Sequence, residues 1–186
     1  MDAFRELEKY GKKIHSAGLV IGTGGNISLR LGDVLFIKKQ ACRMCGVGEE
    51  AFIKTSLSEL VNGKIAGASS ETPLHLSCYE ADDTVGAVVH VHPPYSIAAA
   101  ERTAQLESVS YEFDCVLGER PVPVVDFIKP GSRGLAEAVA RHIREGAVSV
   151  LLSRHGTVSV GADLEQAFLR AVALERACIT FLHTSS

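Results

Sequence analysis

The sequence predicts one α/β domain, residues 1–186, built on a mixed sheet whose strands run mainly antiparallel. Helical periodicity at both ends of the chain and short apolar runs between them indicate this class. The length of 186 residues suits one ordinary domain, and no linker, repeat or low-complexity tract divides it. A chain of this size can bury a sizeable core without disulfides.

The first part of the chain is expected to form a helix and three strands. Apolar residues recur at helical spacing over residues 2–18. The segment 22–30 begins as a glycine-rich turn and continues as a strand. Its hairpin partner is expected at 33–37, and another short strand at 51–54. The polar stretch 38–50 carries no pattern that assigns it an element.

Helices and strands alternate through the rest of the chain. The helices are expected at residues 71–81, 97–102, 135–144 and from 164 onward. The strands are expected at residues 85–92, 121–125, 148–152 and 157–160. Asp163 is expected to cap the final helix, because Gln166 follows three residues later as in a capping box.

Charge, cysteine content and hydropathy exclude several classes of protein. Lys and Arg number 19 and Asp and Glu 22, and this near-balance argues against binding nucleic acid by phosphate neutralisation. The cysteines number 5, an odd and scattered set that does not suit a secreted disulfide framework. The N-terminus has no signal-peptide pattern, and no apolar run approaches the roughly 20 residues that span a bilayer. We therefore expect a cytoplasmic protein with no nucleic-acid or membrane partner.

The strongest local motif is the pair His90 and His92. Alternate residues of a strand share a face, so these two imidazoles can converge on one metal ion. Pro93 stops the strand and so places both histidines at its end. The alternative is a hydrogen-bonded pair of histidines at a strand terminus, because short motifs have a real false-positive risk.

Two further residues are candidates to complete a metal site. His155 follows a predicted core strand, although such a residue is often an ordinary loop histidine. Glu71 lies at a junction between a loop and a helix, where the helix dipole alone would favour a carboxylate. Three imidazoles and one labile position suit a catalytic Zn²⁺ site, and a carboxylate that leaves the metal can act as general acid or base. The remaining histidines occur in helical contexts and are interpreted as structural or solvated: His15, His75, His142 and His183.

Two segments are candidates to bind an anion. The turn that contains Gly25 and Asn26 can present backbone amides and polar side chains to phosphate, although a plain tight turn explains the glycines equally well. It matches neither a P-loop nor a dinucleotide-binding pattern. Ser69 and Ser70 precede a predicted helix, whose unpaired N–H groups favour anions. The pair of cysteines at 42 and 45 is interpreted as a loop feature without a catalytic role.

Taken together and in this order, these motifs resemble the class II aldolase/adducin family. The resemblance rests on the segments 22–28 (GTGGNIS), 69–75 (SSETPLH), 90–96 (HVHPPYS) and 151–156 (LLSRHG). It covers nearly the whole chain, from about residue 2 to residue 182, and implies a three-layer αβα fold.

The resemblance implies a metal-dependent aldolase. The ligands would be His90, His92, His155 and Glu71, and the ion Zn²⁺ or another divalent metal such as Mn²⁺ or Co²⁺. A sugar phosphate such as fuculose 1-phosphate would be cleaved to a dihydroxyacetone-phosphate-like fragment and an aldehyde through a metal-stabilised enediolate. Glu71 would also carry the proton.

The resemblance also implies the remaining site residues and the assembly. The phosphate pocket maps to Gly25, Asn26, Ser69 and Ser70. Family members are typically cyclic homotetramers with the site at a subunit interface. In the aldolase branch a neighbouring subunit supplies a tyrosine as an acid, and Tyr111 lies near the equivalent place.

The chain departs from the family pattern in three places. A Thr-Pro-Ser/Thr-Gly turn usually forms part of the phosphate cradle, whereas residues 54–57 here read KTSL, which leaves open whether the anion is a phosphate. Thr55 is the expected ligand in this segment, and Lys54 is a candidate to compensate for the altered turn. Glu112 aligns with the family tyrosine as well as Tyr111 does. The sequence ends at Ser186, so we expect no counterpart of the C-terminal tail that carries a further tyrosine.

These departures keep other activities open. The same fold and metal serve pentulose-phosphate 4-epimerases, a dehydratase and decarboxylases, and all of these reactions begin with negative charge developing beside a carbonyl. A non-catalytic module like the adducin head domain is a further alternative. The presence of residues at all four ligand positions counts against that module.

Overall fold

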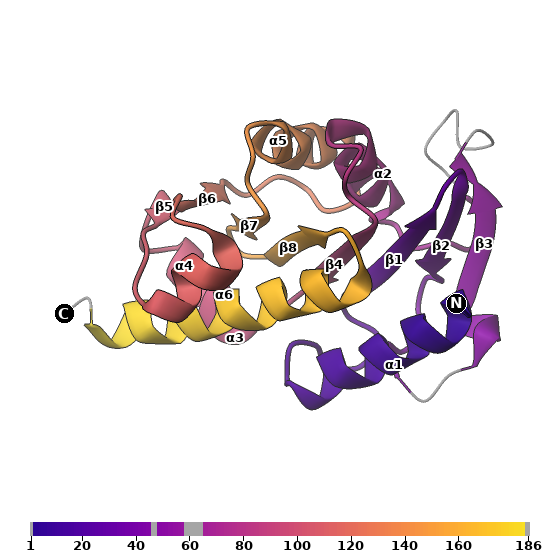
Figure 1. Cartoon of the computed structure of the whole chain (residues 1–186), viewed down its shortest axis with the longest axis horizontal. Helices are drawn as coiled ribbons and strands as arrows, with labels where there is room; N and C mark the ends of the chain where they lie inside the picture. Colours follow the sequence, from indigo (N-terminus) through magenta and orange to yellow (C-terminus); the bar gives the residue numbers. More distant parts are fainter. Residues whose placement is uncertain (1, 46–47, 58–64, 185–186) are drawn as a thin grey trace.

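The structure is a computed structural model that describes residues 2–45, 48–57 and 65–184. A sheet lies between two layers of helices, as Figure 1 shows. Its eight strands follow the order β3-β2-β1-β4-β8-β7-β6-β5. Their bounds are Asn26–Leu31 (β1), Val34–Lys38 (β2), Phe52–Ser56 (β3), Ala87–Val91 (β4), Gln105–Leu106 (β5), Val122–Val125 (β6), Ser149–Leu152 (β7) and Gly156–Gly161 (β8).

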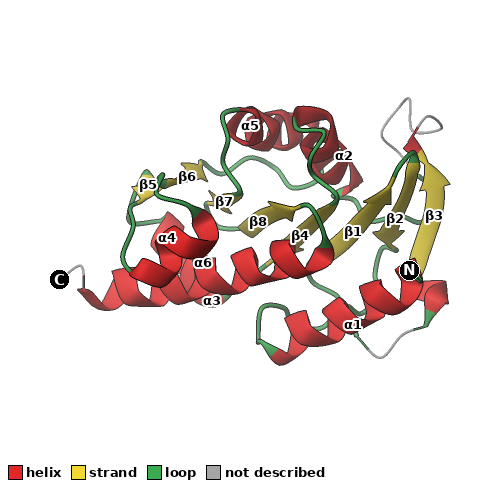
Figure 2. Ribbon diagram, viewed as in Figure 1, coloured by secondary structure: helices red, strands yellow, loops and turns green. Residues whose placement is uncertain are grey.

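The predicted fold class is confirmed. Neighbouring strands run antiparallel throughout the described sheet except β6 and β7, which run parallel. Figure 2 shows the two helical layers on opposite faces of this sheet. One layer contains Ala3–Ser16 (α1), Pro94–Ala100 (α3), Tyr111–Leu117 (α4) and Leu164–Thr184 (α6); the other contains Thr72–Ala81 (α2) and Arg133–Arg144 (α5).

Period-two alternation divides the buried residues between the two faces of the sheet. On β1, Ile27 and Leu29 pack in a core with α1 and α6. The intervening Ser28 therefore points to the opposite face, toward α2. On β4, Val89 packs on the α1 side and Val88 packs with α2 and α5. On both central strands, β1 and β4, the residues that alternate with those on the α1 side lie on the α2 side, and the polar residues of the two strands are among them.

Most predicted elements occur near their expected positions. Asp163 caps α6, since its carboxylate accepts a hydrogen bond from the Gln166 N–H at 2.8 Å. The Gln166 side chain reaches back to the N–H of Ala162 at 2.9 Å, one residue earlier than an ideal capping box requires. The helix expected at 97–102 instead occupies Pro94–Ala100, because proline is well suited to the first position of a helix.

Three short elements were missing from the sequence-based expectation: the 3₁₀ turn Glu49–Ala51, β5 and α4. Helix α4 has 7 residues, too few for an apolar periodicity to stand out. Its start is nevertheless capped, because the Ser110 hydroxyl accepts a hydrogen bond from the Phe113 N–H at 3.1 Å. That the whole of residues 1–186 forms a single domain stays a prediction, since some of these residues lie outside the described ranges.

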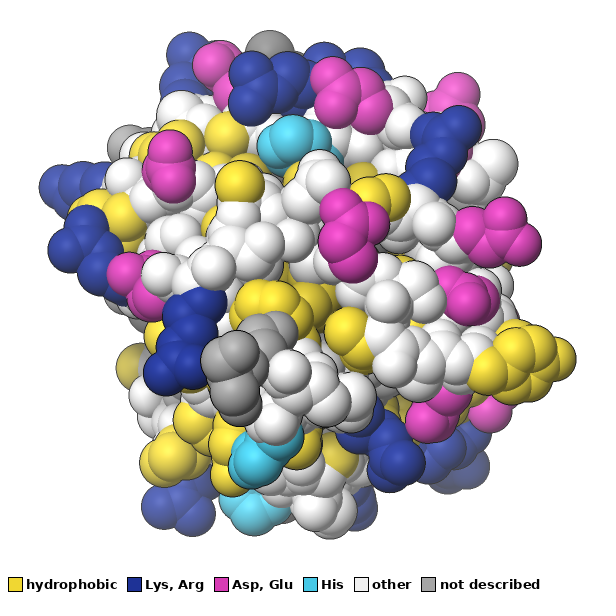
Figure 3. All heavy atoms as spheres, turned by 90° about the vertical axis from the view of Figure 1, so that its left-hand side faces the viewer, with side chains coloured by type: hydrophobic (Ala, Val, Ile, Leu, Met, Phe, Trp, Pro, Cys, Tyr) yellow, Lys and Arg dark blue, Asp and Glu magenta, His cyan; other side chains and the backbone are white. Residues whose placement is uncertain are grey.

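The surface of one end of the molecule carries charges of both signs. Figure 3 views the end that lies at the left of Figure 1, where lysine and arginine side chains are interspersed with acidic ones around hydrophobic side chains. Within the described residues, no helix has both the length and the apolar character needed to cross a membrane.

Candidate metal centre

Two of the three clustered histidines come from the end of the central strand β4. This strand is buried along its whole length and pairs with β1 on one side and β8 on the other. Because Val88 packs on the α2 side, His90 and His92 lie on that side by alternation. Pro93 ends the strand and α3 begins immediately afterwards. The sequence therefore presents both imidazoles at the point where the strand leaves the sheet.

The third histidine reaches the same place from the turn between β7 and β8. The metal-ligating atoms of His90, His92 and His155 all lie within 4.8 Å of one another. Gly156 makes this approach possible: a Cβ atom there would lie 2.1 Å from the Val91 carbonyl oxygen and 2.9 Å from His92 Cδ2. The three residues that spacing and resemblance singled out are thus brought together by the fold.

The geometry of the rings suits chelation. His90 Nδ1 donates a hydrogen bond to the Thr157 carbonyl at 2.9 Å, which leaves its Nε2 with a free lone pair. This Nε2 accepts a hydrogen bond from Nε2 of His92 at 3.1 Å, so the pair also matches the alternative of two hydrogen-bonded histidines. Two nitrogens bound to one tetrahedral Zn²⁺ at ordinary bond lengths lie roughly 3.3 Å apart. The observed separation is therefore close to that of two ligands of one ion.

The surroundings keep the three imidazoles neutral. Burial lowers the pKa of His90 well below its ordinary value, and the neighbouring histidines add to this effect. Burial and the nearby His92 lower the pKa of His155 to about 4. The pKa of His92 is lowered by burial and by the charge of Lys38. Neutral rings offer lone pairs to a cation without first losing a proton.

Three enclosed atoms at this end of the sheet have no hydrogen-bond partner among the described residues: His155 Nδ1, Glu71 Oε2 and Thr157 Oγ1. Buried polar atoms are normally paired, so an orphaned nitrogen and an orphaned carboxylate oxygen fit a site that receives a cation and its ligands. The three histidines thus form a group that could hold a divalent metal.

Glu71 occupies the position before α2 but does not cap it. Its side chain makes no capping hydrogen bond and is 6% exposed. Burial raises the pKa of this carboxyl group, and a hydrogen bond from the Gly131 N–H opposes the rise. Its oxygens are not among the ligand atoms that lie within 4.8 Å of one another. Its role as a fourth ligand therefore stays a prediction.

The glycine-rich turn lies directly against the end of β4. Gly25 has a φ of 65°, and a Cβ atom there would lie 2.7 Å from Val20 Cγ1 and 2.8 Å from the His90 carbonyl oxygen. The next residue, Asn26, is paired with His90 in the sheet register and is buried. A candidate anion-binding side chain thus lies on the strand beside a candidate metal ligand.

The serine pair lies at the entrance to α2, as expected. The Ser69 N–H donates to the Lys38 carbonyl at 3.1 Å, which ties this segment to the end of β2. The Ser69 hydroxyl accepts from the Glu71 N–H at 3.3 Å, and Ser70 is exposed. Both residues precede a helix N-terminus, which favours anions.

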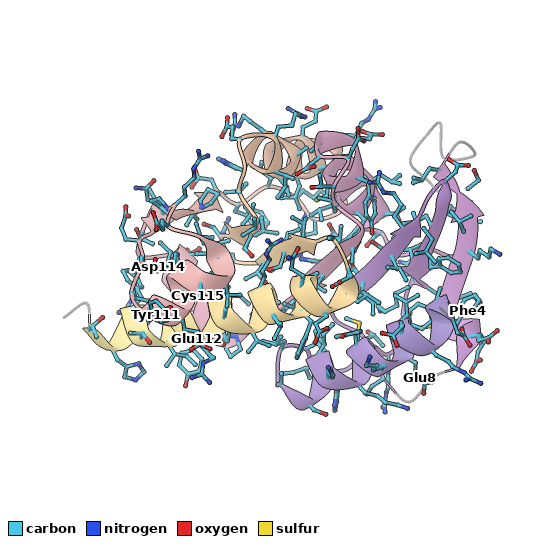
Figure 4. All side chains as sticks on the ribbon, in the orientation of Figure 1. Phe4, Glu8, Tyr111, Glu112, Asp114 and Cys115 are labelled. Atoms are coloured by element: carbon cyan, nitrogen blue, oxygen red, sulfur yellow. The ribbon has the colours of Figure 1, made fainter. Side chains whose placement is uncertain are left out.

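Thr55 and Tyr111 lie apart from these residues. Thr55 is paired with Leu35, three positions along β2 from Lys38, which corresponds to roughly 10 Å along the strand. Tyr111 lies on α4 and is 84% exposed, and Figure 4 shows it near the C-terminal half of α6. No contact among the described residues joins Tyr111 to the three histidines. The neighbouring Glu112 forms an ion pair with Arg176 at 3.5 Å.

Sequence reasoning missed Lys38, a buried cation near the histidines. Its side chain is 2% exposed, and its Nζ donates to the Thr23 carbonyl at 3.1 Å and to the Cys42 carbonyl at 2.6 Å. Burial lowers its pKa. The position of a lysine at the end of the apolar run Val34–Lys38 is the signal that would have indicated it. Cys42 and Cys45 are free thiols, and neither belongs to a metal-ligating group within the described part of the chain.

A family model for the class II aldolase and adducin N-terminal domain matches residues 5–182. The chain belongs to this class II aldolase and adducin family. A protein of Methanococcus maripaludis named L-fuculose phosphate aldolase is 30% identical to this chain over 171 residues, which cover 91% of both chains. A protein of Bacillus thuringiensis named 5-deoxy-D-ribulose 1-phosphate aldolase is 31% identical, over 97% of this chain and 84% of that protein.

Solved structures confirm the class II aldolase fold. The crystal structure of L-fuculose-1-phosphate aldolase from Thermus thermophilus superposes with a TM-score of 0.89, over 98% of this chain and 94% of that chain. The two sequences are 24% identical, so this likeness concerns the fold alone.

Proposed function

We propose that this chain is a metal-dependent carbon–carbon lyase that cleaves a sugar phosphate such as fuculose 1-phosphate. The products would be a dihydroxyacetone-phosphate-like fragment and an aldehyde. The observation that carries the proposal is the convergence of three neutral histidines at the end of β4. Two relatives that cover most of the chain are named as aldolases of ketose 1-phosphates, and this supports the substrate class.

His90, His92 and His155 would hold the metal, with Glu71 as a labile fourth ligand. The nitrogen ligands suit Zn²⁺, and Mn²⁺ or Co²⁺ would also be accepted. When bound, the ion supplies Lewis-acid stabilisation of the negative charge that develops on the substrate beside its carbonyl group. The Thr157 carbonyl, through its hydrogen bond to Nδ1, keeps the lone pair of His90 aimed into the site.

Glu71 would act as the acid and base. The bond between C3 and C4 of the ketose breaks, and C3 gains a proton in one product. The C4 hydroxyl would pass its proton to Tyr111 of a neighbouring subunit as the aldehyde forms, and Tyr111 would return it as an acid in the reverse direction. A carboxyl group whose pKa burial has raised is suited to deliver the proton to C3 and to take it back in the reverse direction. The unpaired Oε2 leaves this group free for that task.

The substrate phosphate would bind between the glycine-rich turn and the start of α2. Gly25 offers its backbone N–H, Asn26 its side-chain amide, and Ser69 and Ser70 their hydroxyls and the helix N-terminus behind them. Thr55 stays a predicted phosphate ligand: it is paired with Leu35, roughly 10 Å along β2 from Lys38, whose carbonyl accepts the Ser69 N–H.

Assembly and compartment are part of the proposal. We propose a cytoplasmic homotetramer in which a neighbouring subunit completes each site and presents Tyr111 as an acid. The 84% exposure of Tyr111 within one chain supports a role across an interface. The partners would be the sugar-phosphate substrate and further copies of this chain.

The test is release of dihydroxyacetone phosphate from a panel of ketose 1-phosphates. Zn²⁺-loaded protein is compared with protein stripped by a chelator and with stripped protein that has been reloaded. The proposal predicts release that the chelator abolishes and Zn²⁺ restores. Release that survives stripping would contradict the metal-dependent reaction. A metal-replete protein that releases nothing would redirect the assignment to epimerisation, dehydration or decarboxylation, and a protein that binds no metal would indicate a non-catalytic module.

A further inference from the structure

Behind Asn26 lies a chain of buried polar side chains that runs between β1 and α2. Tyr79 Oη lies 2.6 Å from Ser28 Oγ, and Ser28 Oγ lies 2.7 Å from His75 Nδ1. His75 Nε2 makes a short hydrogen bond to Asn26 Oδ1. His75 and Ser28 are fully buried, and Tyr79 is 2% exposed. The mechanism proposed above uses only the last member of this chain, Asn26.

The direction of every hydrogen bond in the chain can be worked out by counting hydrogens. Among the described side chains, Ser28 is the hydrogen-bond partner of the Tyr79 hydroxyl, and the backbone N–H of Val88, itself a donor, also acts on this hydroxyl. Tyr79 must therefore donate to Ser28, because a buried hydroxyl hydrogen without an acceptor is costly. Ser28 then donates its single hydrogen to His75 Nδ1.

The ring of His75 carries this direction to Asn26. Burial lowers the pKa of His75 to about 3, so the ring is neutral near neutral pH and has one N–H group. Since Nδ1 accepts from Ser28, the hydrogen is on Nε2 and is donated to Asn26 Oδ1. The carboxamide is thereby fixed with its oxygen toward His75 and its nitrogen turned away.

The free end of Asn26, its Nδ2, is a hydrogen-bond donor that remains available to a ligand. No described residue accepts a hydrogen bond from Asn26 Nδ2. Asn26 is paired with His90 across the sheet, so this nitrogen lies on the strand beside a candidate metal ligand. An amide in the opposite orientation would present its oxygen to the pocket, where it would repel an anion.

We propose that His75, held by Ser28 and Tyr79, is a positioning residue that fixes the Asn26 carboxamide as a hydrogen-bond donor to the substrate phosphate. The inference rests on the proposed sugar-phosphate function and deepens it. The three residues touch no substrate; they act through Asn26. The histidine that the sequence indicated as merely structural thus determines how the anion is recognised.

The test compares His75→Leu with His75→Gln in Zn²⁺-loaded protein. The measured quantities are kcat and KM for the best ketose 1-phosphate, and the inhibition constant of inorganic phosphate. Leucine removes the N–H that orients Asn26, whereas glutamine retains an amide N–H. For His75→Leu we expect KM and the phosphate inhibition constant to rise together by about tenfold or more. This is the loss of affinity expected when one hydrogen bond to a charged group is removed. For His75→Gln we expect both within about threefold of wild type, because the donor is kept.

The neighbours provide a graded series and a matched control. Ser28→Ala should weaken phosphate binding less than His75→Leu, and Tyr79→Phe less again, because each change is one bond further from Asn26. His183→Leu makes the same chemical change at an exposed position on α6 and should alter none of these quantities. If His75→Leu does not fold, the comparison of Ser28→Ala with His75→Gln decides the question in the same way.

Three results separate this inference from the proposed function. Wild-type protein that neither cleaves sugar phosphates nor is inhibited by phosphate would overturn the proposed function, and the inference with it. If wild-type protein cleaves sugar phosphates and is inhibited by phosphate, but the phosphate inhibition constant is unchanged in His75→Leu and Ser28→Ala, the inference alone is overturned. If kcat and bound Zn²⁺ in His75→Leu fall in proportion to the rise in KM, His75 has a purely structural role, and the inference is overturned as well.

Discussion

Replacement of Glu175 by alanine should destabilise the fold at the start of α3, the helix that follows directly after His92. Glu175 lies on α6 and is 9% exposed. Its carboxylate accepts hydrogen bonds from the N–H of Tyr95 at 3.1 Å, from the N–H of Ser96 at 2.8 Å and from the Ser96 hydroxyl at 2.6 Å. It therefore pairs donors of a helix N-terminus that have no partner within their own helix.

The size of the effect follows from these donors. Each buried donor left without a partner costs about 1–3 kcal/mol, and the N–H of Tyr95 can be partly rehydrated. We therefore expect Glu175→Ala to lower the free energy of unfolding by about 3–5 kcal/mol. With a slope of about 2 kcal/mol per molar urea, the unfolding midpoint should fall by about 2 M. Glu175→Gln keeps one acceptor oxygen and should lie between this variant and wild type.

The assay is urea unfolding of metal-free protein, followed by circular dichroism. Glu165→Ala is the matched control, since Glu165 lies on the same helix but is exposed. Its midpoint should change by less than a quarter of the shift in Glu175→Ala. Equal shifts in the two alanine variants would refute the reasoning, because the hydrogen bonds to α3 would then contribute nothing.

Three other predictions follow from the site. His92→Ala should abolish stoichiometric metal binding, measured by elemental analysis, and aldol cleavage with it; retained activity would contradict the mechanism. Gly25→Ala should reduce metal binding and stability, measured together by elemental analysis and urea unfolding, since its Cβ would lie 2.8 Å from the His90 carbonyl oxygen. The pKa of His75 is about 3 in the folded protein, against its ordinary value of 6.5 in the unfolded chain. Between these two pH values, only the unfolded chain binds a proton at His75. Protonation of His75 in the unfolded chain should therefore lower the free energy of unfolding by about 1.4 kcal/mol for each unit by which the pH falls between 6.5 and about 3. In metal-free urea unfolding His75→Gln should lose this contribution; an unchanged pH slope would contradict the burial of a neutral ring.

The end of β4 could be predicted from the sequence because its determinants are local. Two histidines separated by one residue share a face in any strand, and Pro93 must end that strand. The apolar run before them indicates a buried central strand, which the structure confirms. His155 was placed at the end of another core strand by the same reasoning. That the three meet is a property of strand order, which the sequence alone indicated only through the family resemblance.

The polar network around Asn26 could not be predicted, because its contacts join residues far apart in the chain. His75 looked like an ordinary helical histidine, and its partners Ser28 and Asn26 lie 47 and 49 residues away. Glu175 shows the same limit, since its partner Ser96 lies 79 residues away. Lys38 ends an apolar run, but only the fold shows that its amine is enclosed by backbone carbonyls.

The most direct test of the account is a Zn²⁺ titration of stripped protein in which bound metal and aldol cleavage are measured on the same samples. Activity should rise in proportion to bound Zn²⁺ and reach a plateau at about one ion per chain, as a single site of three histidines requires. The variant His155→Ala should show neither the binding nor the activity. Full activity in stripped protein, or a plateau that His155→Ala reaches as well, would contradict the assignment of the three histidines as the metal centre.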